Sequence, residues 1–468
     1  MKKENKSKNE ILEEKIFLKR KSSWLKLNKK DKENVFKFCE NYKDFLGKNK
    51  TERICFENIV KILDKNKFKD IEKVKNAKKG DRIYKKIKNK SLIAFIVGKN
   101  PGSWKIVGSH IDSPRLDLKP NPLYEDSDLA MLKTHYYGGI KKYHWVNTPL
   151  ALHGVIFTKQ GKKITISIGE KEGDPVFIIP DLLAHLSFKQ LQKKAENVVE
   201  GEELNILVGN IPIDDKKINE KFKFAVLKKL NEEYGLTEED FNCGELELVP
   251  ASKASDVGFD RSMICAYGQD DKVCAYTSLM ALMEIKNPNN TAVALFSDKE
   301  EIGSVGNTGA ASFILQNFGY EYKNLLKLKK EVSSIMESSM AISADVTAGM
   351  NPNYKDVNDV KNVSYLGKGV SVEKYGGSFG KLYTNDTHAE YMNYIRKILN
   401  ENNISWQTGE LGKIEVGGGG TIAMFMSRYG MDCVDAGPCV LGMHSPCEVT
   451  SKADVYSAYK LYKIFMQK

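Results

Sequence analysis

The feature that most constrains this chain is a set of strand-length apolar segments that end directly in ionisable side chains. After about residue 250, a helical stretch near residues 275–285 precedes the apolar segment 291–297, and the segment 340–346 follows another helix. This alternation is typical of an α/β unit with a mainly parallel sheet. Such sheets collect ligands beyond the carboxyl ends of their strands. We therefore predict a site built from side chains at strand ends.

The residues before this region predict a different organisation. Residues 1–90 carry apolar positions at helix-like intervals among lysines and glutamates, which predicts an N-terminal helical cap. Several later segments alternate or run apolar at strand length, with no long helix between them. They are residues 91–98, 103–111, 153–158, 162–169 and 205–209. We expect this part of the chain to be rich in β-structure.

Charge and hydropathy argue against several classes of partner. The net charge of +11 comes from 72 Lys and Arg against 61 Asp and Glu, and the excess lies in lysine-rich stretches. Arginine and aromatic residues do not interleave there, so the pattern is typical of a solvated surface, with only a weak attraction to acidic peptides left open. No window offers about 18 uncharged apolar residues, and the charged N-terminus differs from a signal peptide. We expect a cytoplasmic protein without a nucleic-acid or membrane partner.

The eight cysteines are scattered and include no CxxC pair. Small secreted domains use short, regular cysteine frameworks, which this chain lacks. We therefore expect reduced thiols in a reducing compartment. Cys439 and Cys447 flank a histidine, but their hydrophobic context favours packing over metal binding.

Two groups of candidate residues lie at predicted element boundaries. His110 follows a predicted strand and stands two residues before Asp112, a carboxylate of the kind that orients a metal-binding imidazole. Asp270 and Asp271 are adjacent just before a predicted helix. Taken alone, His110 could equally be a structural histidine, and the two aspartates could be an exposed turn or a helix cap.

Further candidates close apolar segments. One segment runs straight into Asp298, Glu300 and Glu301, so one carboxylate could bind metal while its neighbour faces a water molecule. Asp345 and His444 likewise end apolar runs. A surface loop, a cap or a buried hydrogen-bonding group would explain any one of these residues by itself.

Together these residues form a mixed nitrogen and oxygen donor set. Calcium favours oxygen ligands and structural zinc favours thiolates, whereas this set suits two zinc ions. Other chemistries lack their patterns, since the GxSxG match at residues 376–380 follows a polar stretch and no HExxH or P-loop motif occurs. The glycine run at residues 417–420 lacks the lysine of a phosphate site, so we interpret it as backbone packed close to the active site.

A set of motifs, taken in order, resembles the aminopeptidase I and aspartyl aminopeptidase family of dinuclear zinc exopeptidases. The motifs are SHIDSPRLDLKP, YGG, IPDLLAHL, QDDK, DKEEIGS, SADVTAGMNPNY, GGGGTIA and MHSPCEV, between about residues 105 and 450. The resemblance implies an α/β/α sandwich catalytic domain, residues 1–119 plus 248–468. It also implies an inserted β-rich dimerisation domain, residues 120–247.

The same resemblance implies an aminopeptidase that holds two divalent ions, zinc first, with manganese or cobalt as alternatives. Asp270 would bridge the ions, His110 and Asp345 would complete one site, and Glu301 and His444 would complete the other. The substrates would be peptides with a free N-terminus.

Three further roles follow from the resemblance. Glu300 would be the general base, and Asp112 would orient the imidazole of His110. The family also implies a tetrahedral assembly of twelve subunits, in which His185 would reach a neighbour's active site and help bind the substrate carbonyl.

The chain departs from the family pattern at two places. Ala348 and Asn351 replace two histidines that the family often carries, and IKKYHWVNTPL replaces a tryptophan-rich stretch after YGG. A preference for acidic N-terminal residues therefore does not follow. Two other functions remain open: a related dinuclear deacylase or carboxypeptidase, and a catalytically silent homologue that forms a shell.

Overall fold

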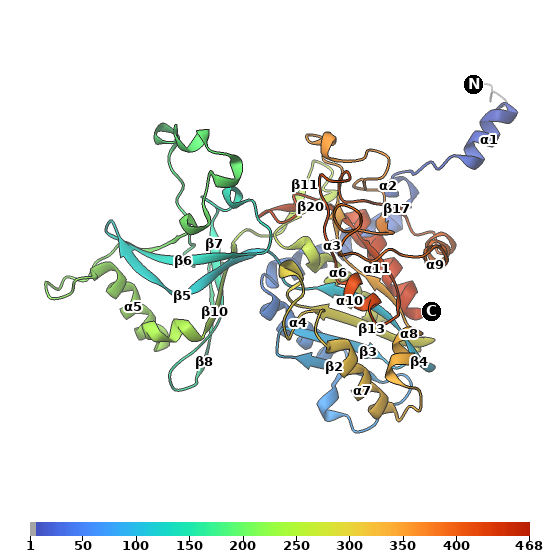
Figure 1. Ribbon diagram of the computed structural model, residues 1–468, viewed down its shortest axis with the longest axis horizontal. Coiled ribbons are helices and arrows are strands. Elements are labelled where there is room, and N and C mark those ends of the chain that lie inside the picture. Colours follow the sequence, from blue (N-terminus) through green and yellow to red (C-terminus); the bar gives the residue numbers. More distant parts are fainter. Residues whose placement is uncertain (1–5) are drawn as a thin grey trace.

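The computed structural model describes residues 6–468 and consists of a large α/β body and a smaller β-rich body (Figure 1). Within these residues the larger body is built on a nine-stranded sheet. Its strands are β1 (Lys69–Asp70), β2 (Arg82–Ile87), β3 (Ser91–Ile96), β4 (Asn100–His110), β13 (Asn290–Ser297), β14 (Met340–Ser343), β16 (Val370–Glu373), β17 (Trp406–Thr408) and β18 (Asp432–Gly437).

The strand order places the parallel strands at the centre of this sheet. The order is β1-β2-β3-β13-β4-β14-β18-β16-β17. Strands β13, β4, β14 and β18 are parallel neighbours, and β3 and β16 flank them as antiparallel strands. The register aligns Ser297 at the end of β13 with His110 at the end of β4. The carboxyl ends of the central strands therefore meet at one edge, as the sequence predicted.

Helices cover both faces of the sheet. One face carries α3 (Lys29–Lys48), α4 (Glu52–Lys65), α6 (Gln269–Glu284), α9 (Ala389–Glu401) and α11 (Lys452–Gln467). The other carries α7 (Ile314–Leu326), α8 (Val332–Glu337) and α10 (Ala423–Ser427). Adjacent residues of β4 divide between them, since Val107 packs into the first hydrophobic cluster and Ile106 into the second. This arrangement confirms the predicted α/β/α sandwich.

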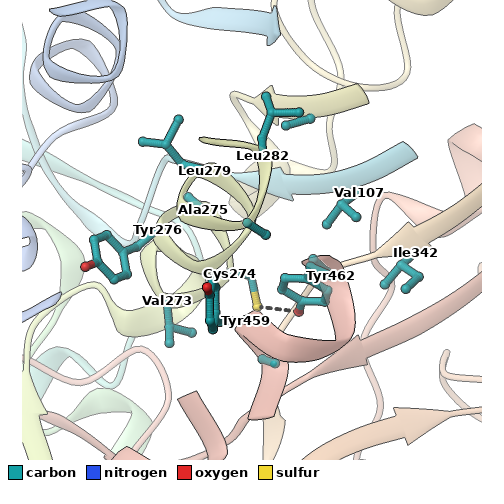
Figure 2. Packing of buried hydrophobic residues seen from close by; sticks show 14 of the residues in the cluster. Val107, Val273, Cys274, Ala275, Tyr276, Leu279, Leu282, Ile342, Tyr459 and Tyr462 are labelled. Carbon is teal, nitrogen blue, oxygen red and sulfur yellow. Dashed lines mark hydrogen bonds between the residues drawn. The ribbon is translucent and has the colours of Figure 1, made fainter. Parts of the chain in front are cut away.

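Helix α6 lies at the middle of the first cluster and is buried on almost every side. Figure 2 shows its side chains, among them Leu279 and Cys274, against Tyr462 of α11 and Val107 of β4. The Tyr462 hydroxyl donates hydrogen bonds to the carbonyl of Ala436, at 2.6 Å, and to the sulfur of Cys274, at 3.4 Å. Because α6 is buried on almost every side, its position is fixed by contacts all round the helix.

The smaller body is an antiparallel sheet in the order β8-β7-β10-β5-β6-β9. Its strands are β5 (Arg115–Asp126), β6 (Leu129–Tyr137), β7 (Leu150–Phe157), β8 (Lys163–Ile168), β9 (Ile206–Gly209) and β10 (Gly244–Pro250). Helix α5 (Lys221–Tyr234) packs on this sheet through Val226, Leu227 and Leu230, over a separate hydrophobic cluster.

A third sheet has the order β11-β12-β20-β19-β15. Its strands are β11 (Ser255–Val257), β12 (Met263–Ala266), β15 (Thr347–Ala348), β19 (Cys439–Leu441) and β20 (Glu448–Ser451).

Two predictions from the sequence are wrong. The predicted helical cap extended to residue 90, but its α-helices end with α4, and residues 82–87 form a strand that pairs with β3. Residues 1–5 of that cap lie outside the described residues. The cysteines are not all reduced, since Cys265 and Cys447 form a disulfide. Cys265 lies on β12 and Cys447 directly precedes β20, and these strands pair although 182 residues separate the two cysteines. From residue 6 onward, no helix is long and apolar enough to cross a membrane.

Candidate metal centre

The carboxyl edge of the central strands brings together the predicted metal ligands. His110 is the last residue of β4, the loop with Glu301 follows β13, and Asp345 follows β14. Asp270 lies at the start of α6, where its backbone dihedral angles are not helical, and His444 lies in the turn between β19 and β20. Five separate segments therefore supply these side chains to one place.

Asp270 lies between the two histidines. Its Oδ1 is 3.1 Å from Nε2 of His110, and its Oδ2 is 3.1 Å from Nε2 of His444. The carboxylate thus presents one oxygen to each imidazole. This is the arrangement in which a single carboxylate can contact two cations at once.

The other carboxylates divide between the two histidines. Glu301 Oε2 is 3.3 Å from Nε2 of His444. On the other side, Glu300 Oε2 and Asp345 Oδ1 are 3.8 and 3.9 Å from Nε2 of His110. Two groups have donor atoms within 4.8 Å of one another: His110, Asp270 and Glu301, and His110, Asp271 and Asp345.

Hydrogen bonds orient both imidazoles so that Nε2 faces the centre. Nδ1 of His110 lies 3.3 Å from Oδ1 of Asp112 and 3.1 Å from its backbone carbonyl. Nδ1 of His444 donates to the backbone carbonyl of Gly139 at 2.7 Å. The backbone amides of Glu300 and Glu301 each donate to Asp112 at 3.2 Å. Such partners of the second ring nitrogen are typical around metal-binding histidines.

Burial disfavours the ionised form of several acids at the centre. Burial is the largest cause that raises the pKa of Glu301 and of Asp345 well above their ordinary values. For His444 burial acts in the opposite direction, but the hydrogen bond to Asp270 and the charge of Glu301 outweigh it and raise the pKa to about 10. Oε1 of Glu301 and Oδ1 of Asp271 are buried and have no hydrogen-bond partner. A divalent cation would neutralise these groups, and the imidazole and carboxylate donors fit zinc.

The centre opens into a cavity of about 590 Å³. Its lining includes Asp270, Glu300, Glu301, Asp345 and His444, together with the glycine-rich segment Gly418, Gly419 and Gly420. The interpretation that these glycines lie close to the site is therefore correct. Burial raises the pKa of Glu300 to about 7, while the neighbouring histidines lower it and the neighbouring aspartates raise it, so this carboxyl can exchange a proton near neutrality.

The structure does not bring His185 to this cavity within one chain. His185 is exposed, in a short 3₁₀ helix, Ala184–Leu186, of the smaller body, and it is not among the residues that line the cavity. Asp298 also faces elsewhere, because it pairs with Lys299 at 2.8 Å and accepts from Thr308 at 2.6 Å.

Sequence reasoning missed several residues that hold the centre. Glu448 accepts from the backbone amides of His444, at 2.8 Å, and Asp270, at 3.1 Å, so one buried carboxyl fixes two proposed ligands. Asp271 accepts from the amide of His110 at 3.4 Å. Their motifs, MHSPCEV and QDDK, were noticed, but neither shows which backbone groups its acid contacts. The YGG motif includes Gly139, but it does not show that the carbonyl of this residue accepts from His444.

Comparisons with known proteins show the family of this chain. The family model of the aminopeptidase I zinc metalloproteases (M18) matches residues 45–466. A probable M18 family aminopeptidase 1 of Clostridium acetobutylicum is 47% identical over 458 residues, which are 95% of this chain and 98% of that protein.

Solved structures of M18 aminopeptidases are also similar to this chain. The crystal structure of an M18 aminopeptidase from Thermotoga maritima has a TM-score of 0.92 at 46% identity and covers 97% of this chain and 100% of that one. The yeast mApe1 dodecamer is similar in fold, with a TM-score of 0.73 at 21% identity over 91% of this chain and 95% of that one. From the family match and these identities, the chain belongs to the M18 family of zinc metalloproteases and is a metal-dependent aminopeptidase, a hydrolase of peptide bonds.

Proposed function

We propose that the enzyme removes the N-terminal residue of peptides at a centre of two divalent ions, zinc first, with manganese or cobalt as alternatives. The proposed ligands share the carboxyl edge of the sheet and are His110, Asp270, Glu301, Asp345 and His444. The observation that carries this proposal is the position of Asp270, which presents one oxygen to each of two histidines. A single structural ion would not require a carboxylate with one oxygen directed to each of two histidines.

Glu300 is the proposed general base. Zinc ions, when bound, would polarise the substrate carbonyl and acidify a water molecule. Glu300 lines the cavity beside the proposed ligands, so its carboxylate can take the proton of the attacking water. The same carboxyl then returns the proton to the nitrogen of the departing peptide. Asp112 orients His110 and also accepts a hydrogen bond from the amide of Glu300. One carboxylate therefore positions both a proposed ligand and the proposed base.

The cavity favours neutral N-terminal residues over acidic ones. Its lining contains no lysine or arginine among the described residues. It contains apolar side chains instead, among them Val346, Leu411, Met424, Phe425 and Met443. An acidic substrate side chain would enter this space without a cationic partner and beside several carboxylates, which is unfavourable. We infer a preference for apolar residues such as leucine.

A substrate panel tests this function. We expect leucyl-p-nitroanilide to be cleaved with a kcat/KM at least about tenfold higher than that of the aspartyl analogue, because a carboxylate in this pocket is unpaired. N-acetyl-leucyl-p-nitroanilide is the matched control, since it lacks the free amine. N-acetyl-leucine tests the alternative of a deacylase. Turnover of N-acetyl-leucine without turnover of leucyl-p-nitroanilide would replace our proposal by that alternative, and no turnover of either would favour the silent homologue.

Glu300→Gln and Glu301→Gln form a matched pair that separates the general base from a metal ligand. Glu300→Gln is expected to lower kcat by about 10²- to 10⁴-fold and to keep two equivalents of zinc, because the amide cannot accept the proton. Glu301→Gln is expected to retain only one equivalent. Activity assays and elemental analysis of the purified variants measure both effects. Full zinc content in Glu301→Gln, or near wild-type activity in Glu300→Gln, would contradict the proposed roles.

The pH dependence follows from the pKa of Glu300. A base acts when it is ionised, and burial raises the pKa of Glu300 to about 7, so the active form is lost as the pH falls through that value. Nearby bound cations favour the ionised form, and the acid limb of kcat/KM is therefore expected at or below about pH 7. Zinc content measured at each pH distinguishes protonation from metal loss. A flat profile down to about pH 5 would argue against Glu300 as the base.

The proposal also covers how copies of the chain assemble into an oligomer. We propose that residues 120–247 form a dimerisation domain inserted between residues 1–119 and 248–468 of the catalytic domain, and that the enzyme forms a tetrahedral dodecamer. The exposed position of His185 in the smaller body supports a role of this histidine in a neighbour's cavity, and the fold is shared with a dodecameric yeast protein.

Co-expression of two inactive variants tests this contribution in trans. His185→Ala is expected to lose about 10²- to 10³-fold in kcat with its zinc intact, because it removes a donor to the substrate carbonyl. Mixed assemblies with Glu300→Gln are expected to regain activity, since some sites then combine an intact Glu300 with a neighbour's intact His185. Purified mixed oligomers with no more activity than either parent would show that His185 does not act in trans.

A further inference from the structure

One contact joins the smaller sheet to the proposed metal centre. Tyr137 is the last residue of β6, which lies in the smaller body (Figure 1). Its hydroxyl donates a hydrogen bond of 2.8 Å to Oδ2 of Asp112. Asp112 is buried, and its Oδ1 faces Nδ1 of His110 at 3.3 Å. A side chain of the β-rich body therefore contacts the carboxylate that orients a proposed ligand.

Within residues 6–468, Tyr137 is the one side chain that donates a hydrogen bond to Oδ2 of Asp112. The remaining donors to Asp112 are the amides of Glu300 and Glu301, both at 3.2 Å, and these move with the loop after β13. Burial raises the pKa of Tyr137 far above its ordinary value, and the neighbouring charge of Asp112 acts in the same direction, so the phenol remains a donor. Tyr137 does not line the cavity, so it is not placed to touch substrate.

Arg115 fixes the ring of Tyr137 from one side. Its guanidinium carbon lies 3.9 Å from the centre of that ring, which is a favourable position for a cation above an aromatic face. Arg115 is itself buried and pairs with Glu52 of α4 at 3.1 Å and with Glu247 of β10 at 3.3 Å. It also pairs with Asp117 at 2.8 Å. Acids from both bodies thus immobilise the group on which Tyr137 packs.

The segment that follows Tyr137 reaches the second histidine. The carbonyl of Gly139 accepts from Nδ1 of His444 at 2.7 Å. Between them Gly138 has a φ of +76°, and a Cβ there would lie 3.3 Å from Cβ of Glu301. Residues 137–139 therefore contact Asp112, which faces His110, and they contact His444 directly.

We propose that Tyr137 is a positioning residue of the metal centre, whose hydroxyl holds Asp112 so that His110 presents Nε2 to the cation. Through this contact the β-rich body sets the metal affinity of the catalytic body. The inference rests on the proposed function, because it requires His110 to be a ligand. Partners of this kind typically change metal affinity by about 10- to 100-fold when they are removed.

Zinc affinity of the Tyr137→Phe variant tests this role. The metal-free protein is titrated with zinc in competition with a chromophoric chelator, and Tyr136→Phe is the matched control because Tyr136 is 40% exposed. We expect Tyr137→Phe to weaken one zinc site by about 10- to 100-fold and Tyr136→Phe to change neither site. Zinc dissociation constants of Tyr137→Phe within about twofold of wild type would overturn the inference.

A double-mutant cycle distinguishes positioning from general packing. If Tyr137 acts through Asp112, the loss caused by Tyr137→Phe disappears in an Asp112→Ala background. The same loss in both backgrounds would show a merely structural effect and would overturn the inference. Failure of the wild-type protein itself to bind zinc would instead overturn the proposed function, so the two failures are distinguishable.

Discussion

The structure depends on one constraint, the burial of the Asp270 carboxylate between two histidines. Burial opposes ionisation of this acid, yet hydrogen bonds from His110 and His444 hold its pKa below the ordinary value. A buried charge is stable only when its partners are fixed. The fold supplies that rigidity, because His110 ends a central strand and Asp270 begins a helix that is buried on almost every side. Changes far from the site that loosen this helix therefore act on the carboxylate.

Two further buried acids, Glu448 and Asp112, position the segments that carry the proposed ligands. Glu448 is held by two backbone amides of the proposed ligand segments, although burial raises its pKa to about 8. Asp112 serves the opposite side through the amides of Glu300 and Glu301. The chain thus uses carboxylates to position its own backbone as well as, in the proposed function, to bind cations. Because backbone amides donate to Glu448 and Asp112, these two acids stabilise the segments around the centre although other carboxylates lie close to them.

The sequence predicted the parts of the site that depend on local pattern. An apolar run that ends in an acid or a histidine identifies a strand end, and parallel strands bring such ends together, so the sequence could place His110, Glu301 and Asp345 at one edge of the sheet. Contacts between residues that are far apart in the sequence could not be predicted in this way. The Cys265–Cys447 disulfide requires β12 and β20 to be neighbours, and the carbonyl of Gly139 has no side chain to mark it. The strand at residues 82–87 was missed because its short, lysine-rich sequence has few apolar residues, and its pairing with β1 and β3 joins it to segments that the sequence does not mark as neighbours.

The strand order also determines when the centre can form as the ribosome releases the chain. Strand β4 lies between β13 and β14, whose residues begin at 290 and 340, whereas all strands of the smaller sheet lie between residues 115 and 250. The smaller sheet can therefore be complete while His110 still lacks both neighbouring strands. Contacts of such long sequence separation form slowly. All strands of the β-rich body are therefore available early in synthesis, whereas the segments that carry the proposed ligands are complete only once His444 has been added.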